Sequence, residues 1–391
     1  MKIAFLSGAD KNAGDYLIAH RSKALLQAYV KDCVITEFAR NTALDSQLEE
    51  LNECDVAVFA GGPGYVSDMY PGRFPLVEDL ELIRPKLFAL GMGCRAALDK
   101  AEEVHFTPKT HVLLQRLEAD GFGLGCRDLL TKRILEANGI TTAIFTGCPA
   151  WYDLSKVDIP ELLSKPARSD VRRIAVSDPA VQRNIPAAKY LVEQLMQAFP
   201  LAKVSLVFHR GWTEDEFTGS ELAEAQKRLV VWAKNKGVEV VDIAYSDEGF
   251  SVYDNCDLQI GYRVHAHLYS ISERMPSYLI EEDSRGYGAS ESLGCSGHIS
   301  LDEPRLPERL VSKVMGKDRA STLFSAKMQR DRAQMMVRHV LNDIENGYME
   351  ADGQCKTASE YFTKMKEHVL RINHAYSDLS KRIPEKARGG K

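Results

Sequence analysis

The sequence lacks any close pair of cysteines. Its eight cysteines are scattered, and the nearest two, Cys33 and Cys54, are 21 positions apart. Neither a CxxC motif nor the ligand spacing of a zinc ribbon is therefore present, and no metal site is expected. Isolated cysteines in a chain of 391 residues are typical of a reducing compartment, where they act as small core side chains. The sequence thus predicts a cytoplasmic protein without a disulfide framework.

Long apolar runs and a surplus of basic residues are also missing. No stretch approaches the roughly 18 apolar residues of a membrane-spanning helix, and the apolar start of the chain is too short for a signal peptide. The 50 Lys and Arg are outnumbered by 55 Asp and Glu, which gives a formal net charge of −5. This balance argues against a nucleic acid as partner. It leaves room for a local basic pocket that binds a small anion.

Short apolar runs that end in glycine alternate with amphipathic segments over the first 300 positions or so. This alternation predicts the α/β class, with parallel sheets covered by helices on both faces. The predicted strands are 2–6, 55–60, 86–90 and 141–145 in the first half, and 173–177, 203–208, 238–243, 258–261 and 278–281 in the second. Two Rossmann-like domains are therefore expected, at 1–155 and 171–303. After about residue 304 only helical patterns remain, at 318–346 and 358–379, and they predict a helical C-terminal extension over 304–391.

Candidate binding residues follow the predicted strands, because open parallel sheets bind ligands outside the carboxyl ends of their strands. In the first half these residues are Gly14, Asp15, Gly61, Gly62 and Arg127. Glycines let a backbone approach a ligand closely or turn sharply, and the sequence does not decide between the two. The glycine spacing matches neither GxGxxG nor GxxxxGK[ST], so no nucleotide-binding loop is indicated.

The segment from Gly261 to His267 carries the strongest chemical signal. It leaves a strand and enters a helix, where backbone N–H groups and the helix dipole favour an anion. Arg263 adds a guanidinium suited to carboxylate or phosphate oxygens. His265 follows two residues later, and imidazole is the side chain best suited to proton transfer near neutral pH. A buried, hydrogen-bonded histidine in the core is the alternative.

Asp283 and Arg285 follow the last predicted strand and are expected at the same edge of the cleft. Asp283 could orient His265 or accept a hydrogen bond from a sugar hydroxyl, and Arg285 could hold a phosphate. Alternatively, the two side chains simply pair with each other. The sequence does not decide between a role in binding and a simple ion pair.

The order of these motifs resembles that of the polysaccharide pyruvyl transferase family. The C-terminal part of the resemblance is Gly-x-Arg-x-His at 261–265, Pro-Ser at 276–277, Asp-x-Arg at 283–285 and Leu-Gly at 293–294. The N-terminal part is Asn-Ala-Gly-Asp at 12–15, the glycines at 61–62, Arg-Asp at 127–128 and Gly-Cys-Pro at 147–149. Two positions depart from the family pattern. Cys148 stands where the family has aspartate, and Asp178 follows the strand that commonly ends in arginine, so that Arg183 is a candidate substitute.

The resemblance implies two domains that face a cleft, as in the GT-B glycosyltransferases, with the acceptor on the N-terminal domain and the donor on the C-terminal domain. The implied reaction transfers the enolpyruvyl group of phosphoenolpyruvate to a glycan or lipid-linked saccharide as a pyruvate ketal, in cell-surface polysaccharide biosynthesis. It needs no cofactor beyond this donor substrate. His265 would be the general acid and base, with Arg263 and Arg285 on the donor.

Two rival functions remain. A GT-B glycosyltransferase would bind a nucleotide sugar, with Glu281 or Glu282 on the ribose. A non-catalytic family member would act as a binding subunit, and the departures at Cys148 and Asp178 motivate this alternative. The basic tail at 381–391 is either a solvated terminus or a weak peripheral contact with the inner face of an anionic membrane. The oligomeric state stays open, with a homo-oligomer as one alternative.

Overall fold

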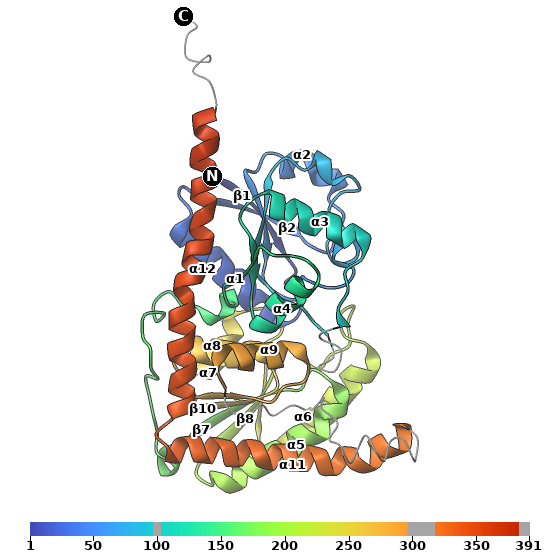
Figure 1. Ribbon diagram of the computed structural model, residues 1–391. Helices are drawn as coiled ribbons and strands as arrows, with labels where there is room; N and C mark the ends of the chain where they lie inside the picture. Colours follow the sequence, from blue (N-terminus) through green and yellow to red (C-terminus); the bar gives the residue numbers. More distant parts are fainter. Residues whose placement is uncertain (97–102, 296–316, 383–391) are drawn as a thin grey trace, which may run out of the picture.

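The computed structural model describes residues 1–96, 103–295 and 317–382 (Figure 1). The N-terminal half forms a six-stranded sheet of parallel pairs in the order β2-β1-β3-β4-β5-β6. Its strands are β1 (Lys2–Ser7), β2 (Val34–Ala39), β3 (Val56–Ala60), β4 (Lys86–Met92), β5 (Leu124–Cys126) and β6 (Ala143–Phe145). Its helices are α1 (Ala13–Tyr29), α2 (Leu48–Leu51), α3 (Pro108–Ala119) and α4 (Leu129–Ala137).

The C-terminal half repeats this architecture with a five-stranded parallel sheet in the order β11-β10-β7-β8-β9. Its strands are β7 (Arg173–Ser177), β8 (Lys203–Phe208), β9 (Glu239–Asp242), β10 (Leu258–Gly261) and β11 (Ser277–Leu279). The helices around it are α5 (Ile185–Ala198), α6 (Ser220–Asn235), α7 (Ser251–Asp254), α8 (Val264–Ser272) and α9 (Ser284–Leu293).

Alternation along the central strands explains why each sheet is covered on both faces. In β1, Ile3 and Phe5 belong to one apolar cluster, whereas Ala4 and Leu6 belong to another. Successive side chains of a strand point to opposite faces, so a strand that is apolar throughout must be buried on both. The first cluster continues into the C-terminal domain and α12 (Met349–Arg382), so one hydrophobic core runs through both halves of the molecule.

Two long helices end the described chain. Helix α11 (Lys317–Glu345) packs along α5 at the lower end of the molecule, and α12 then runs up past both domains (Figure 1). On the C-terminal domain, Arg274 donates from Nη2 to Ser359 Oγ at 3.2 Å. On the N-terminal domain, His368 Nε2 lies 2.9 Å from the carbonyl oxygen of Ala89. Helix α12 therefore fastens the two domains to each other.

The expected α/β fold class is confirmed: two Rossmann-like domains with parallel sheets, and a helical C-terminal end. The prediction was wrong in detail at the last helix, which begins at Met349 and not at 358. Gly347 and Tyr348, both at positive φ, separate it from α11, and the burial of Ala351 and Cys355 supports its first turns. Residues 304–316 of the expected extension and 383–391 of its basic tail lie outside the described residues. Within the described ranges, no helix combines the length and apolarity needed to cross a bilayer.

Candidate functional site

A pocket lies between the two domains, at the carboxyl ends of their strands. It brings together five of the residues selected from the sequence. Its lining is Asn12 and Arg127 from the N-terminal domain, and Ala180, His209, Tyr262, Arg263, Val264, His265, Glu282, Asp283 and Arg285 from the C-terminal domain.

His265 crosses the cleft to contact Gly14. It sits in the first turn of α8, and a Cβ placed on Gly14 would lie 2.0 Å from its Nδ1 atom. Only glycine leaves room for the ring at this position. Burial lowers the pKa of His265 to about 4; Asp15 opposes this shift, and Arg127 adds to it. The imidazole is therefore neutral near pH 7 and able to accept a proton.

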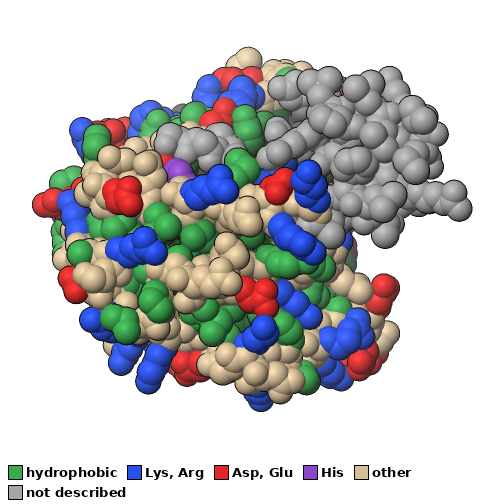
Figure 2. All heavy atoms as spheres, turned by 90° about the horizontal axis from the view of Figure 1, so that it is seen from below, with side chains coloured by type: hydrophobic (Ala, Val, Ile, Leu, Met, Phe, Trp, Pro, Cys, Tyr) green, Lys and Arg blue, Asp and Glu red, His purple; other side chains and the backbone are tan. Residues whose placement is uncertain are grey.

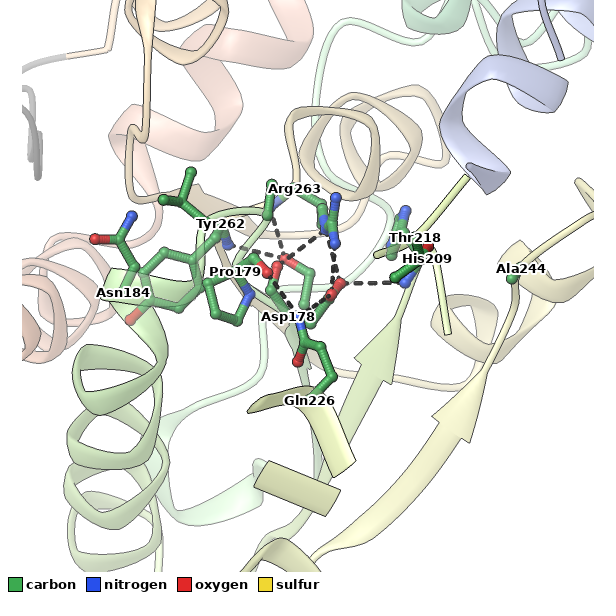
Figure 3. A network of polar contacts seen from close by, with 12 residues as sticks. Asp178, Pro179, Asn184, His209, Thr218, Gln226, Ala244, Tyr262 and Arg263 are labelled. Atoms are coloured by element: carbon green, nitrogen blue, oxygen red, sulfur yellow. Dashed lines mark hydrogen bonds and ion pairs between the residues drawn. The ribbon is translucent and has the colours of Figure 1, made fainter. Parts of the chain in front are cut away.

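Arg263 is held by Asp178, the residue that departs from the family pattern. Its Nε donates to Asp178 Oδ1 at 2.7 Å and its Nη2 to Oδ2, while the backbone N–H of His209 donates to Oδ1 at 3.1 Å (Figure 3). Burial opposes the charge of Arg263, but Asp178 outweighs it and the pKa of the guanidinium is raised. The departure at Asp178 thus orients an arginine of the pocket.

Arg285 and Arg127 are oriented in the same way, each by an aspartate that also caps a helix. Arg285 donates to Asp283 from Nε at 2.9 Å and Nη2 at 2.7 Å. Arg127 donates from Nε to Asp128 at 2.9 Å and from Nη2 to the carbonyl of Cys94 at 2.6 Å. Asp283 and Arg285 therefore pair with each other, as one of the two alternatives predicted, and both also line the pocket. A role of Arg285 in binding phosphate stays a prediction.

All three arginines use the same two nitrogens for protein acceptors. Nε and Nη2 of Arg127, Arg263 and Arg285 are engaged, whereas no acceptor for Nη1 is found in the described parts of the chain. A guanidinium fixed in this way retains donors for a further anion without losing side-chain freedom on binding.

Other selected residues lie beside the pocket and do not line it. Asp15, in the first turn of α1, accepts a hydrogen bond from Asn12 Nδ2 at 3.2 Å. Gly61 and Gly62 have φ angles of 49° and 67°, so they make a sharp turn after β3. Arg183 is exposed on the turn before α5. Cys148, the other departure, is buried in the core, and burial raises its pKa to about 11.

Sequence reasoning missed or undervalued several polar residues near the cleft. Glu282 was considered only for a ribose, but it accepts hydrogen bonds from the backbone N–H of Ala180 at 2.7 Å and from Asn184 Nδ2 at 2.7 Å. Burial raises its pKa to about 7. Arg40 was missed because it follows β2, a strand that the sequence pattern did not reveal. Position at a strand end was an available signal for Glu282, which follows the predicted strand 278–281, but not for Arg40.

Comparisons with known proteins identify the family. The family model described as polysaccharide pyruvyl transferase matches residues 12–284. No curated protein matches the chain.

Three solved structures are similar to the chain over most of their length, at low sequence identity. A protein assigned as a UDP-N-acetylglucosamine 2-epimerase from Listeria monocytogenes has 10% identity and a TM-score of 0.49, with 98% of this chain and 97% of that chain covered. The UDP-GlcNAc 2-epimerase from Neisseria meningitidis has 11% identity and a TM-score of 0.46, with 88% and 100% covered. Sucrose-phosphate synthase from Thermosynechococcus elongatus has 11% identity and a TM-score of 0.45, with 97% and 99% covered.

Proposed function

The chain belongs to the polysaccharide pyruvyl transferase family, a family of transferases, and from this premise we propose that it is a ketal pyruvyl transferase. It transfers the enolpyruvyl group of phosphoenolpyruvate to two hydroxyls of one sugar in a glycan or lipid-linked saccharide. Inorganic phosphate leaves, and the product is a cyclic pyruvate ketal in a cell-surface polysaccharide.

One observation carries the proposal: a neutral histidine lies in the same pocket as three arginines that have donors to spare. Phosphoenolpyruvate carries a carboxylate and a phosphate, and guanidinium groups match both in geometry and charge. The C-terminal domain offers Arg263 and Arg285 for these two groups, and both line the pocket. A bound trianion next to His265 would also raise the pKa of the ring and make the imidazolium easier to form.

The chemistry then needs one group that both accepts and donates a proton. His265 accepts the proton of the first sugar hydroxyl, whose oxygen bonds to C2 of the enolpyruvyl group. The same proton is delivered to the methylene carbon, which becomes the methyl group. The second hydroxyl oxygen then displaces phosphate from C2, and its proton leaves with the phosphate. Atoms and charges balance without an oxidant or a reductant.

The domains divide this work across the cleft. Arg263, Arg285 and His265 come from the C-terminal domain, which we assign to the donor. Asn12 and Arg127 come from the N-terminal domain, which we assign to the acceptor side, and Asp15 lies next to them in α1. We assign Asp283 as a positioning residue, because it holds Arg285.

The test is a phosphate-release assay with the purified full-length chain, phosphoenolpyruvate and candidate glycans, with the ketal detected by mass spectrometry. A positioned acid and base contributes about 10²–10⁴-fold, so His265→Asn should lower kcat by roughly that factor. His111→Asn, on α3 and outside the pocket, is the matched control. Full activity of His265→Asn contradicts the assignment. A rise in Tm with nucleotide diphosphate sugars but none with phosphoenolpyruvate favours the glycosyltransferase alternative.

A further inference from the structure

Arg40 is a buried arginine at the carboxyl edge of the N-terminal sheet, outside the His265 pocket. It follows β2, and its backbone N–H donates to the carbonyl of Ser7 at 2.9 Å. Only 5% of the residue is exposed. Glycines at the ends of the two neighbouring strands make room for it: a Cβ on Gly8 would lie 2.0 Å from Nε, and one on Gly62 would lie 3.0 Å from Nη1. The guanidinium thus packs closely against the backbone of these two glycines.

The Arg40 guanidinium has no protein partner in the parts of the chain that the structure describes. Its side chain makes no hydrogen bond and no ion pair there, and the only bond of the residue is the backbone bond to Ser7. Arg73 lies within electrostatic range, and its buried Nε likewise has no acceptor among the described residues. A largely buried charge without a protein partner is costly, and a bound counter-ion would offset that cost.

The charges around Arg40 support the same conclusion. Burial lowers the pKa of Arg40 to about 10, and the positive charge of Arg73 adds to this effect. Asp15 and Asp10 act in the opposite direction without forming an ion pair with it. A bound anion would offset both the desolvation cost of the Arg40 charge and its repulsion by Arg73.

This arginine pair adjoins the His265 pocket. Arg95 is within electrostatic range of both Arg73 and Arg285. Asp15 is likewise within range of both Arg40 and His265. A ligand held at Arg40 would therefore lie on the N-terminal side of the cleft, which is the side assigned to the acceptor.

We propose that Arg40 and Arg73 form a second anion subsite, which binds a phosphoryl group carried by the acceptor saccharide. The ligand class is a sugar phosphate or diphosphate, because two guanidinium groups within electrostatic range of each other are matched by a dianion better than by a single carboxylate. The inference rests on the proposed function for the identity of the acceptor, but the anion subsite itself does not depend on that function. Gly8 and Gly62 contribute to the subsite because the absence of a Cβ atom leaves space for the Arg40 side chain.

The first experiment measures the subsite without any catalytic step. Inorganic pyrophosphate is titrated calorimetrically into the full-length wild type and the variants Arg40→Gln, Arg73→Gln, Arg285→Gln and Arg84→Gln. The first two variants should weaken binding at least tenfold. Arg84→Gln, at an exposed position before β4, should leave Kd unchanged. Loss of binding in Arg285→Gln with no change in Arg40→Gln would place the anion in the His265 pocket and overturn the proposal.

A stability measurement separates a binding role from a structural role. Because Arg40 is buried without a partner, Arg40→Gln should retain or raise the Tm of the free protein while it loses the Tm increase caused by pyrophosphate. A clear fall in the Tm of the free protein would make Arg40 a structural residue and contradict the subsite.

The second experiment identifies the source of the phosphoryl group. The ketal assay compares one sugar as a nucleotide diphosphate derivative, as a lipid diphosphate derivative in detergent, and without phosphate. At least one phosphorylated form should have a KM at least tenfold below that of the neutral sugar, and Arg40→Gln should abolish this difference. Equal use of the neutral sugar by both proteins overturns the acceptor assignment. If no sugar is converted, the proposed function fails, and the pyrophosphate titration still decides the subsite.

Discussion

At the scale of single residues, the contact between Gly14 and His265 gives a prediction that needs no substrate. Gly14→Ala places a methyl group against the His265 ring and 2.8 Å from its Cβ. Overpacking of this kind costs about 1–3 kcal/mol, and we expect that loss in urea unfolding. His265→Ala should recover part of the loss, because it removes the ring but keeps the Cβ atom.

The matched control is Gly353 in α12, where an added Cβ meets nothing within 4 Å. Gly353→Ala should stabilise the protein by up to about 1 kcal/mol. A loss in this control equal to that in Gly14→Ala, or additive effects of Gly14→Ala and His265→Ala, would show that the contact across the cleft is not the cause.

The Asp178–Arg263 pair gives a second prediction at this scale. Asp178 is fully buried, and Asp178→Ala leaves the guanidinium of Arg263 buried without its carboxylate. Removing one partner of a buried pair costs about 3–5 kcal/mol, whereas replacing both partners with apolar residues costs far less. The double variant Asp178→Leu/Arg263→Met should therefore be more stable to urea than Asp178→Ala. An equal or larger loss in the double variant would contradict this account.

The sequence predicted the residues of the pocket better than it predicted their partners. Arg127, Arg263, His265, Asp283 and Arg285 were selected because they follow strands, and they line one pocket. The neutralisation of Arg263 by Asp178, 85 positions away, depends on the pairing of β10 with β7 and was not visible in the sequence. Strand order is a property of the whole sheet, and it decides which strand ends become neighbours.

At the scale of secondary-structure elements, His368 links α12 to the N-terminal sheet and should make that link sensitive to acid. Burial lowers its pKa to about 4 from an ordinary value of 6.5. At this residue the folded state therefore binds fewer protons than the unfolded state between pH 6.5 and 4. The stability that the neutral His368 contributes is fully present above pH 6.5 and is lost as the pH falls toward 4. For each such histidine, the free energy of unfolding falls by up to about 1.4 kcal/mol per pH unit in this window.

His368→Gln should reduce this loss of stability between pH 6.5 and 4.5, because Gln retains a donor for the Ala89 carbonyl and does not titrate. The measurement is the free energy of unfolding across this pH range. His374→Gln, on the same helix, is the control. An unchanged pH dependence in His368→Gln would show that its protonation does not weaken the link.

Elements were predicted well where apolar periodicity was strong and missed where it was weak. β3 and β10 are buried at every position and were found from their apolar runs. β2 is an edge strand whose Val34 is 60% exposed, and β5 has only three residues. Their existence depends on pairing with β1 and β4, since neither has enough apolar sequence of its own.

At the scale of the whole molecule, the mild acidity of the chain conceals a cleft that is rich in arginine. On the face seen in Figure 2, basic and acidic side chains are interspersed, and green, tan, red and blue surfaces alternate. Arg127, Arg263 and Arg285 instead lie together where the two domains meet, with Arg95 in electrostatic range of Arg285. Net charge alone argued against a polyanion partner, whereas the recognition of a small anion depends on how the fold distributes its arginines.

Lys11 reaches from the N-terminal domain into the C-terminal domain and links loops on the two sides of the cleft. Lys11, on the loop after β1, is 1% exposed. Its ammonium donates to Asp215, to Thr218 Oγ1 at 2.7 Å and to the carbonyl of Thr213 at 3.1 Å, all in the C-terminal domain. Lys11→Met removes these contacts, and the two loops should separate more often.

Two backbone hydrogen bonds beside Lys11 report this opening. The N–H of Ala13 donates to the carbonyl of His209 at 3.0 Å, and that of Tyr245 donates to the carbonyl of Lys11 at 2.8 Å. Hydrogen exchange of these segments should be at least tenfold faster in Lys11→Met, which corresponds to about 1.4 kcal/mol. Lys23→Met, which removes a surface ion pair with Glu37, should leave exchange unchanged because exposed pairs contribute little. Equal exchange in Lys11→Met and wild type would mean that closure depends on the core and on α12 alone.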